Sequence, residues 1–153
     1  MTRILLALAM LLSMPAAAQE WQPFGVKEFG FTFDVPPGFE LTENSEQGAA
    51  FEGENDAFLA VWGVSLPKSE FEAEIKNRMA EDEAAGWELT YRRVTPDWAS
   101  YSGVRDEQIR YVRAIAICDD RAAVFVINYP RDEKIPYDPV VERMVRSLKP
   151  EGC

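Results

Sequence analysis

The chain has 153 residues, of which 26 are acidic and 16 are basic, and it contains no histidine. Its formal charge of −10 repels phosphate backbones and anionic lipid headgroups, which argues against binding to nucleic acids or membrane surfaces. Without histidine the chain cannot form serine–histidine or cysteine–histidine nucleophile systems, and two cysteines are too few for a closed zinc site, so we expect no metal and no cofactor.

Residues 1–18 have the pattern of a secretory signal peptide. One basic residue precedes an apolar run over residues 4–12, and a proline and three small residues follow it. A membrane anchor is the alternative, but the run is far shorter than the roughly 20 residues that span a bilayer. A lipid anchor would need a cysteine at the cleavage point, and the first cysteine is Cys118. We therefore expect a soluble mature chain in the periplasm or outside the cell, without membrane insertion.

Residues 19–153 have the length of a single domain. After an extended aromatic lead-in over residues 19–27, three phenylalanines alternate with other residues over 29–34 and predict a strand with one buried face. Two adjacent prolines then stop this strand. Residues 39–41 are expected to pair briefly before a polar loop over 42–47.

Two further strands are predicted over residues 49–53 and 57–65, joined by an acidic turn. The second of these is apolar on both faces. Such a strand is typical of the middle of a sheet that is covered on both sides.

A helix follows the second strand. Ser69 and Glu72 have the spacing of a capping box, and Gly86 supplies the left-handed end. The residues that recur every four positions and should face the core are Phe71, Ile75 and Met79.

Residues 87–94 predict the next strand, and a segment over 98–103 leads into a long strand over 108–118. A tight turn then joins that strand to another over 122–129, which is typical of a hairpin. By simple alternation, the strand over residues 87–94 should carry three side chains on one side: Trp87, Leu89 and Tyr91.

The last helix is expected to begin with Asp138 as its cap and Pro139 in its first position. Its core-facing residues are Val140, Val141, Met144, Val145 and Leu148. The order is therefore strands, helix, strands, helix, with mostly short turns between strands. This order predicts an α+β fold in which helices pack on a largely antiparallel sheet.

Four segments together resemble one known family: the run Phe29 to Phe39, the acidic helix after Pro67, the segment 98–103 before a long strand with Tyr111, and Ser147 to Pro150 after an amphipathic helix. The chain is similar in these segments to the PsbP-like family, over nearly all of residues 29–150. The resemblance implies an α/β/α sandwich, a fold shared with a Ran-binding nuclear-import factor. It also implies a non-catalytic assembly or binding role. No functional residue of the family is carried over.

Cys118 and Cys153 are the only cysteines, and an exported protein keeps paired thiols oxidised. We expect a disulfide between them. Two free thiols, or a bridge between two chains, are the alternatives.

Basic and aromatic residues share strand faces in the second half of the chain. Tyr91 and Arg93 lie two positions apart on one predicted strand, as do Tyr111 and Arg113 on another. If the strands align, Arg93, Tyr111 and Arg113 are candidates for binding an anionic or carboxylate-bearing partner. The alternative is that the arginines pair with nearby acids such as Glu88 or Glu107.

We therefore expect an acidic, exported, non-catalytic binding or assembly-accessory module that contacts another protein or a small ligand in the envelope, and no nucleic acid. The alternative is a small carboxylate-dependent hydrolase or a weak calcium-binding protein. The acidic turn that offers oxygen ligands for calcium comprises Glu52, Glu54, Asn55 and Asp56. Oligomeric state and partner stay open at this point.

Overall fold

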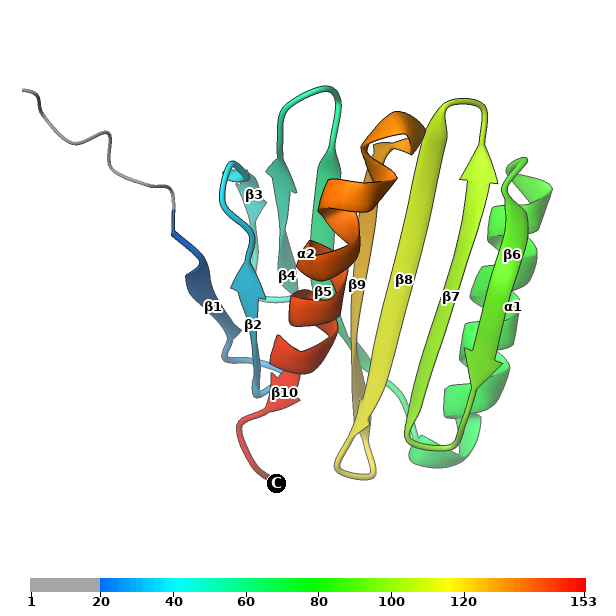
Figure 1. The fold of residues 1–153 in the computed structure, drawn as a ribbon. Helices are drawn as coiled ribbons and strands as arrows, with labels where there is room; N and C mark the ends of the chain where they lie inside the picture. Colours follow the sequence, from blue (N-terminus) through cyan, green and yellow to red (C-terminus); the bar gives the residue numbers. More distant parts are fainter. Residues whose placement is uncertain (1–19) are drawn as a thin grey trace, which may run out of the picture.

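The structure is a computed structural model that describes residues 20–153, so the predicted signal peptide over residues 1–18 lies outside it. Within the described part, seven strands form one large sheet and three form a small one (Figure 1). The strands are β1 (Gln22–Val26), β2 (Phe31–Val35), β3 (Glu40–Asn44), β4 (Gly48–Glu52), β5 (Phe58–Ser65), β6 (Glu88–Val94), β7 (Trp98–Arg105), β8 (Gln108–Ile117), β9 (Arg121–Pro130) and β10 (Lys149–Pro150). The helices are α1 (Phe71–Ala84) and α2 (Lys134–Ser147).

The large sheet has the strand order β3-β4-β5-β9-β8-β7-β6, and every neighbouring pair in it is antiparallel. Short turns join most consecutive strands, and such turns connect antiparallel neighbours. β5 and β9 lie inside the sheet, as expected for the apolar residues 57–65. The expectation that both faces of β5 are covered was wrong, because its buried residues alternate with half-buried ones on the face that no helix covers. The predicted α+β fold with helices on an antiparallel sheet is confirmed.

The small sheet, β1-β2-β10, packs against the face of the large sheet that α2 also covers. Phe31 and Phe33 of β2 are almost fully buried and form one hydrophobic cluster with Phe125 and Ile127 of β9. The alternation along β2 therefore has the predicted cause, since Thr32 and Asp34, its second and fourth residues, turn away from this core.

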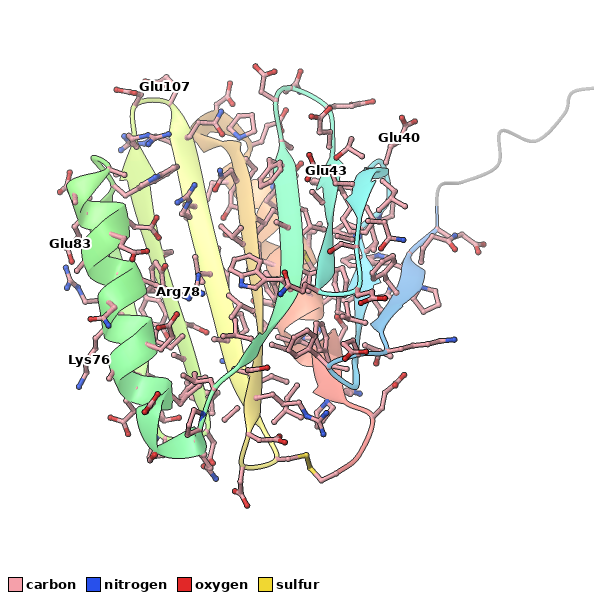
Figure 2. All side chains as sticks on the ribbon, turned by 180° about the vertical axis from the view of Figure 1, so that it is seen from behind. Glu40, Glu43, Lys76, Arg78, Glu83 and Glu107 are labelled. Carbon is pink, nitrogen blue, oxygen red and sulfur yellow. A yellow bond between two sulfur atoms is a disulfide. The ribbon has the colours of Figure 1, made fainter. Side chains whose placement is uncertain are left out.

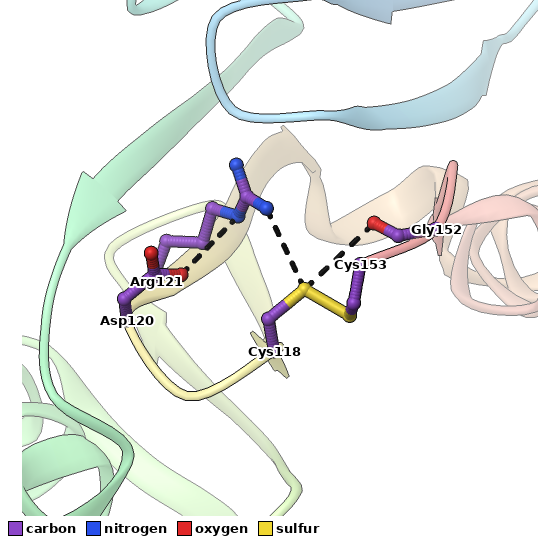
Figure 3. Close-up of a disulfide and its surroundings, with 5 residues drawn as sticks. All are labelled: Cys118, Asp120, Arg121, Gly152 and Cys153. Carbon is purple, nitrogen blue, oxygen red and sulfur yellow. Dashed lines mark hydrogen bonds and ion pairs between the residues drawn. A yellow bond between two sulfur atoms is a disulfide. The ribbon is translucent and has the colours of Figure 1, made fainter.

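The chain end is held beside the β8–β9 turn by a disulfide between Cys118 and Cys153 (Figure 3). Arg121 lies next to this bond, with its Nη2 atom 3.5 Å from Cys118 Sγ. β10 precedes the bond and pairs with β2. The bond thus links the small sheet to the end of the large one.

Each helix covers only half of one face of the large sheet. In Figure 1, α2 lies in front of β5 and β9, whereas α1 lies behind the β6 end of the sheet. Seen from behind in Figure 2, α1 is in front and the β3–β5 half has no helix over it. The residues of α1 that pack on this side are the predicted Phe71, Ile75 and Met79. The front of β8, β7 and β6 is therefore left without a helix.

Both helices begin elsewhere than predicted. α1 starts at Phe71 after a 3-10 turn over Lys68–Glu70, so Ser69 lies inside that turn and its side chain caps nothing. α2 starts at Lys134, and Pro139 lies inside it rather than at its first position. Pro139 has no N–H to donate to the carbonyl of Ile135, four residues earlier. Ile135 lies in the first turn of α2 and is 84% exposed, so water can bind to that end of the helix instead.

The region predicted as brief pairing followed by a polar loop is instead the strand β3. It pairs with β4 through a register shift between Leu41 and Glu43, and all five of its residues are exposed. An edge strand with no buried face has no alternation of apolar residues by which it could be recognised.

Candidate ligand-binding face

The front of β6, β7 and β8 gathers the residues singled out from the sequence. Arg93 on β6 stands opposite Ser100 on β7, which stands opposite Arg113 on β8. We call these three residues the basic row. The neighbouring row runs from Tyr91 through Ser102 to Tyr111. β6 and β8 are thus not neighbours, and β7 between them carries a short serine side chain in each of these two rows.

A β-bulge decides which residues of β6 belong to this face. The pairing of β6 with β7 shifts by one residue between Leu89 and Tyr91. Leu89 consequently packs in the cluster under α1, whereas Tyr91 is 44% exposed on the opposite face. The prediction that Trp87, Leu89 and Tyr91 share one side was therefore wrong, because an extra residue, Thr90, interrupts the alternation.

The two arginines of the basic row lie over one tryptophan. Trp98 precedes Ser100 by two residues on β7, and its ring centroid is 5.2 Å from Cζ of Arg93 and 4.3 Å from Cζ of Arg113. Such contacts hold a guanidinium over an aromatic face. The sequence reasoning missed Trp98, and only the register of β7 could have placed it here.

Neither arginine of the basic row has an acidic partner among residues 20–153. Pairing with Glu88 or Glu107, the alternative expected from the sequence, does not occur there. Arg113 donates through Nη1 to Ser100 Oγ at 3.0 Å, and its buried Nε has no partner in the described part. Burial lowers the pKa of Arg113, because loss of water disfavours the charged form.

A cleft of about 750 Å³ adjoins this face, between α2 and the sheet. From the sheet it is lined by Thr90, Ser102, Gly103, Val104, Ile109, Tyr111 and Tyr129, and from the α2 side by Arg131, Lys134, Asp138, Val141, Glu142, Val145 and Arg146. Tyr111 belongs both to the cleft and to the row beside Arg113. The cleft and the basic row therefore form one continuous surface.

Two phenols lie on the sheet side of the cleft. Burial raises the pKa of Tyr111, and burial together with the charge of Asp138 raises the pKa of Tyr129 to about 12. Tyr129 is also held in place by stacking on Tyr137, with ring centroids 4.4 Å apart. At neutral pH both hydroxyls stay protonated, so they can donate hydrogen bonds to a ligand but are poor general bases.

The α2 side of the cleft carries charges of both signs. Lys134 Nζ lies 2.9 Å from Asp138 Oδ2, and Arg146 Nη1 lies 4.0 Å from Glu142 Oε2. Arg131 forms no ion pair within residues 20–153. Two of its three cations are thus paired with acids, and this side of the cleft carries one net positive charge.

The acidic turn considered for calcium serves as a link between elements. Asn55 donates through Nδ2 to Oε1 of Glu133 at 2.6 Å. Among the residues that the structure describes, no group of three or more acidic or cysteine side chains is placed to hold a metal ion. Neither helix in that part of the chain is long and apolar enough to cross a membrane.

No protein-family model matches the chain, and no curated protein does. Among solved structures, it is similar to the solution structure of cyanobacterial PsbP (CyanoP) from Synechocystis sp. PCC 6803, with a TM-score of 0.66 and 15% identity over 92% of this chain and 98% of that one. A weaker likeness, with a TM-score of 0.44 and 10% identity over 86% and 91% of the two chains, is to LpqN, a Mycobacterium tuberculosis protein involved in cell envelope biogenesis. The first comparison confirms the PsbP-like fold expected from the sequence.

Proposed function

We propose that this chain, with its PsbP-like fold, is an exported, non-catalytic binding or assembly-accessory module whose residues 19–153 act as one domain. It holds its partner on the basic row and in the adjoining cleft. The observation that carries the proposal is the pair Arg93 and Arg113, which share Trp98 and lack an acidic partner in residues 20–153 of an acidic protein. A charged surface next to an open cleft is an arrangement suited to binding.

The chemistry of the cleft supports binding over catalysis. Its two phenols are held protonated, and its two carboxylates, Asp138 and Glu142, each face a cation one helical turn away. A hydrolase with two acidic residues needs one of them to be free to accept or give a proton. If that alternative were right, Asp138→Asn together with Glu142→Gln would abolish a hydrolytic activity measurable in the unmodified protein.

Export is supported by the signal-like residues 1–18 and by a disulfide that an oxidising compartment preserves. We expect mass spectrometry of the exported protein to find an N-terminus at Gln19 and no alkylatable thiol. An uncleaved chain, or two reactive thiols in native material, would contradict this part of the proposal.

The binding surface is tested by photo-crosslinking in the source organism. Glu142 is exposed on the cleft and its ion pair is long, so a benzoylphenylalanine at this position should leave the fold intact. We expect a discrete crosslinked product that disappears when Arg93 and Arg113 are both replaced by glutamine. The matched control places the crosslinker at Lys76, which is exposed on α1 behind the sheet. Identical products from both positions, or none from Glu142, would overturn the proposal.

A further inference from the structure

The basic row carries positive charge that the described part of the chain does not neutralise. Three other arginines on these strands have partners: Arg92 pairs with Glu83, Arg110 with Asp82, and Arg105 donates to the carbonyl of Ala85. Arg113 differs from these because it is partly buried yet faces only a serine hydroxyl. Taking a guanidinium out of water costs free energy unless an anion accompanies it. An anion supplied from outside the chain would offset this cost.

The geometry of the row suits one small planar anion. Arg93 and Arg113 both stand opposite Ser100, and their Cζ atoms lie 5.2 and 4.3 Å from the centroid of the same indole ring, so both guanidinium groups belong to one small area of the sheet. A carboxylate offers two oxygens with about four acceptor sites, and guanidinium groups bind it through paired hydrogen bonds. Ser100 fixes one end of the Arg113 guanidinium, which limits the rotamer freedom that binding has to remove.

The cleft sets what must be attached to that anion. Tyr111 lies two residues from Arg113 on the same face of β8, which is about 7 Å along a strand. Beyond Tyr111 the cleft offers apolar side chains from both sides, including Ile109 of β8 and Val145 of α2. A ligand that fills both regions has a charged end and, roughly one strand repeat away, an apolar or aromatic body.

The surrounding charge favours a single negative charge on the ligand. The α2 side of the cleft carries three basic and two acidic side chains and so adds only one net positive charge, whereas the whole chain carries −10. Each additional negative charge on a ligand therefore meets further repulsion. A carboxylate fits this field better than a dianionic phosphate does.

We infer that the basic row and the cleft together bind a carboxylate attached to an apolar or aromatic group. This inference rests on the proposed function and deepens it by naming the ligand chemistry. A small organic acid and the C-terminus of a peptide present the same group.

The inference is tested by calorimetric titration of the mature protein at low ionic strength. We expect 4-phenylbutyrate to bind at least tenfold more tightly than 4-phenylbutyramide, because charge-assisted hydrogen bonds are lost in the amide. Butyrate should bind at least tenfold more weakly than 4-phenylbutyrate, because it has no phenyl group to fill the cleft. A tripeptide Gly-Gly-Phe with a free carboxylate and a blocked N-terminus forms a further arm. Tighter binding of this peptide assigns the site to a protein C-terminus, and tighter binding of phenylbutyrate assigns it to a small acid. Both results support the inference.

Variants locate the binding on the basic row. Arg93→Gln and Arg113→Gln should each weaken phenylbutyrate binding about tenfold or more without changing thermal stability by more than a few degrees. The matched control is Arg92→Gln, since Arg92 is the next residue of β6 but points to the other face and pairs with Glu83. Its affinity for phenylbutyrate should be unchanged.

Three results would overturn the inference: equal affinity for the acid and its amide, tighter binding of phenyl phosphate than of phenylbutyrate, or equal losses in Arg92→Gln and Arg113→Gln. Failure here is distinguishable from failure of the proposed function. If the acids do not bind but the crosslink from Glu142 persists, only the carboxylate assignment is wrong. If the acids bind but no crosslink forms, the surface is a ligand site and the accessory role is wrong.

Discussion

Asp82 joins α1 to β7 and β8, and its removal should destabilise the protein strongly. Its carboxylate accepts hydrogen bonds from Tyr101 Oη at 2.6 Å and from Arg110 Nη1 at 2.5 Å. Arg110 also donates through Nε to Asn128 at 3.0 Å and lies 4.3 Å from the ring centroid of Trp87. The side chains of Asp82 and Arg110 are only 15% and 22% exposed. Asp82→Ala therefore leaves a largely buried guanidinium and a buried phenol without their acceptor.

The expected loss follows from the burial of this pair. Breaking a buried ion pair by removing one partner costs roughly 3–5 kcal/mol, and the remaining access of water to Arg110 places this case near the lower value, about 3 kcal/mol. Such a loss is a large share of the roughly 5–15 kcal/mol by which domains are stable. With a urea dependence of about 1.5 kcal/mol per molar, the unfolding midpoint should fall by about 2 M.

The adjacent residue of the same helix provides the control. Glu83 pairs with Arg92 at 3.1 Å, but these side chains are 45% and 51% exposed. Glu83→Ala should therefore cost less than about 1 kcal/mol. The double variant Asp82→Ala with Arg110→Met should be more stable than Asp82→Ala alone, since no unpaired charge remains. Equal midpoints for Asp82→Ala and Glu83→Ala would refute the reasoning.

Three other predictions concern stability. Reduction of the Cys118–Cys153 bond, which closes a loop of 35 residues, should lower the free energy of unfolding by about 4 kcal/mol on the chain-entropy estimate, measured as the urea midpoint with and without reductant. Burial raises the pKa of Tyr129 to about 12, so between pH 10 and 12 this phenol ionises in the unfolded chain but not in the folded one, and the free energy of unfolding should fall with pH. In Tyr129→Phe this fall, measured by urea titrations at several pH values, should be less steep; the same steepness in both proteins would contradict the prediction. Gly63→Ala should cost about 1–3 kcal/mol in the same assay, because a Cβ there would stand 2.0 Å from the ring of the buried Phe29; a midpoint equal to that of the unmodified chain would show that the ring moves aside freely.

The strands that could be predicted are those whose signals are local. β5 consists almost entirely of apolar residues, and a run of turn-forming residues separates β8 from β9. The helix starts were mistaken because two local signals compete. Ser69 has capping-box spacing, yet Pro67 begins a 3-10 turn that carries the chain past it.

The candidate site could be predicted only in part. The residues on one face of a strand can be read from the sequence of that strand, but the strands and helices that lie beside it cannot. Arg93, Tyr111 and Arg113 were selected from their strand positions. Trp98 joins them only through the register of β7 with both neighbours, and Tyr129 through the position of α2 over β9. The pattern of apolar residues within one strand does not show which strands are its neighbours or how they are aligned with it.

The bulge at Thr90 reverses which residues of β6 face each side of the sheet. Beyond it, odd-numbered residues face the cleft side and even-numbered residues face α1, whereas the order before it is reversed. If β6 paired with β7 without the bulge, Thr90 would stand opposite Ser102 and Arg92 opposite Ser100, so Arg92 and Arg93 would exchange faces. The side chains that this surface presents can therefore differ among proteins of this fold through the presence or absence of one bulge, without any substitution. Comparison of such proteins must accordingly align strand register before it compares residue identity.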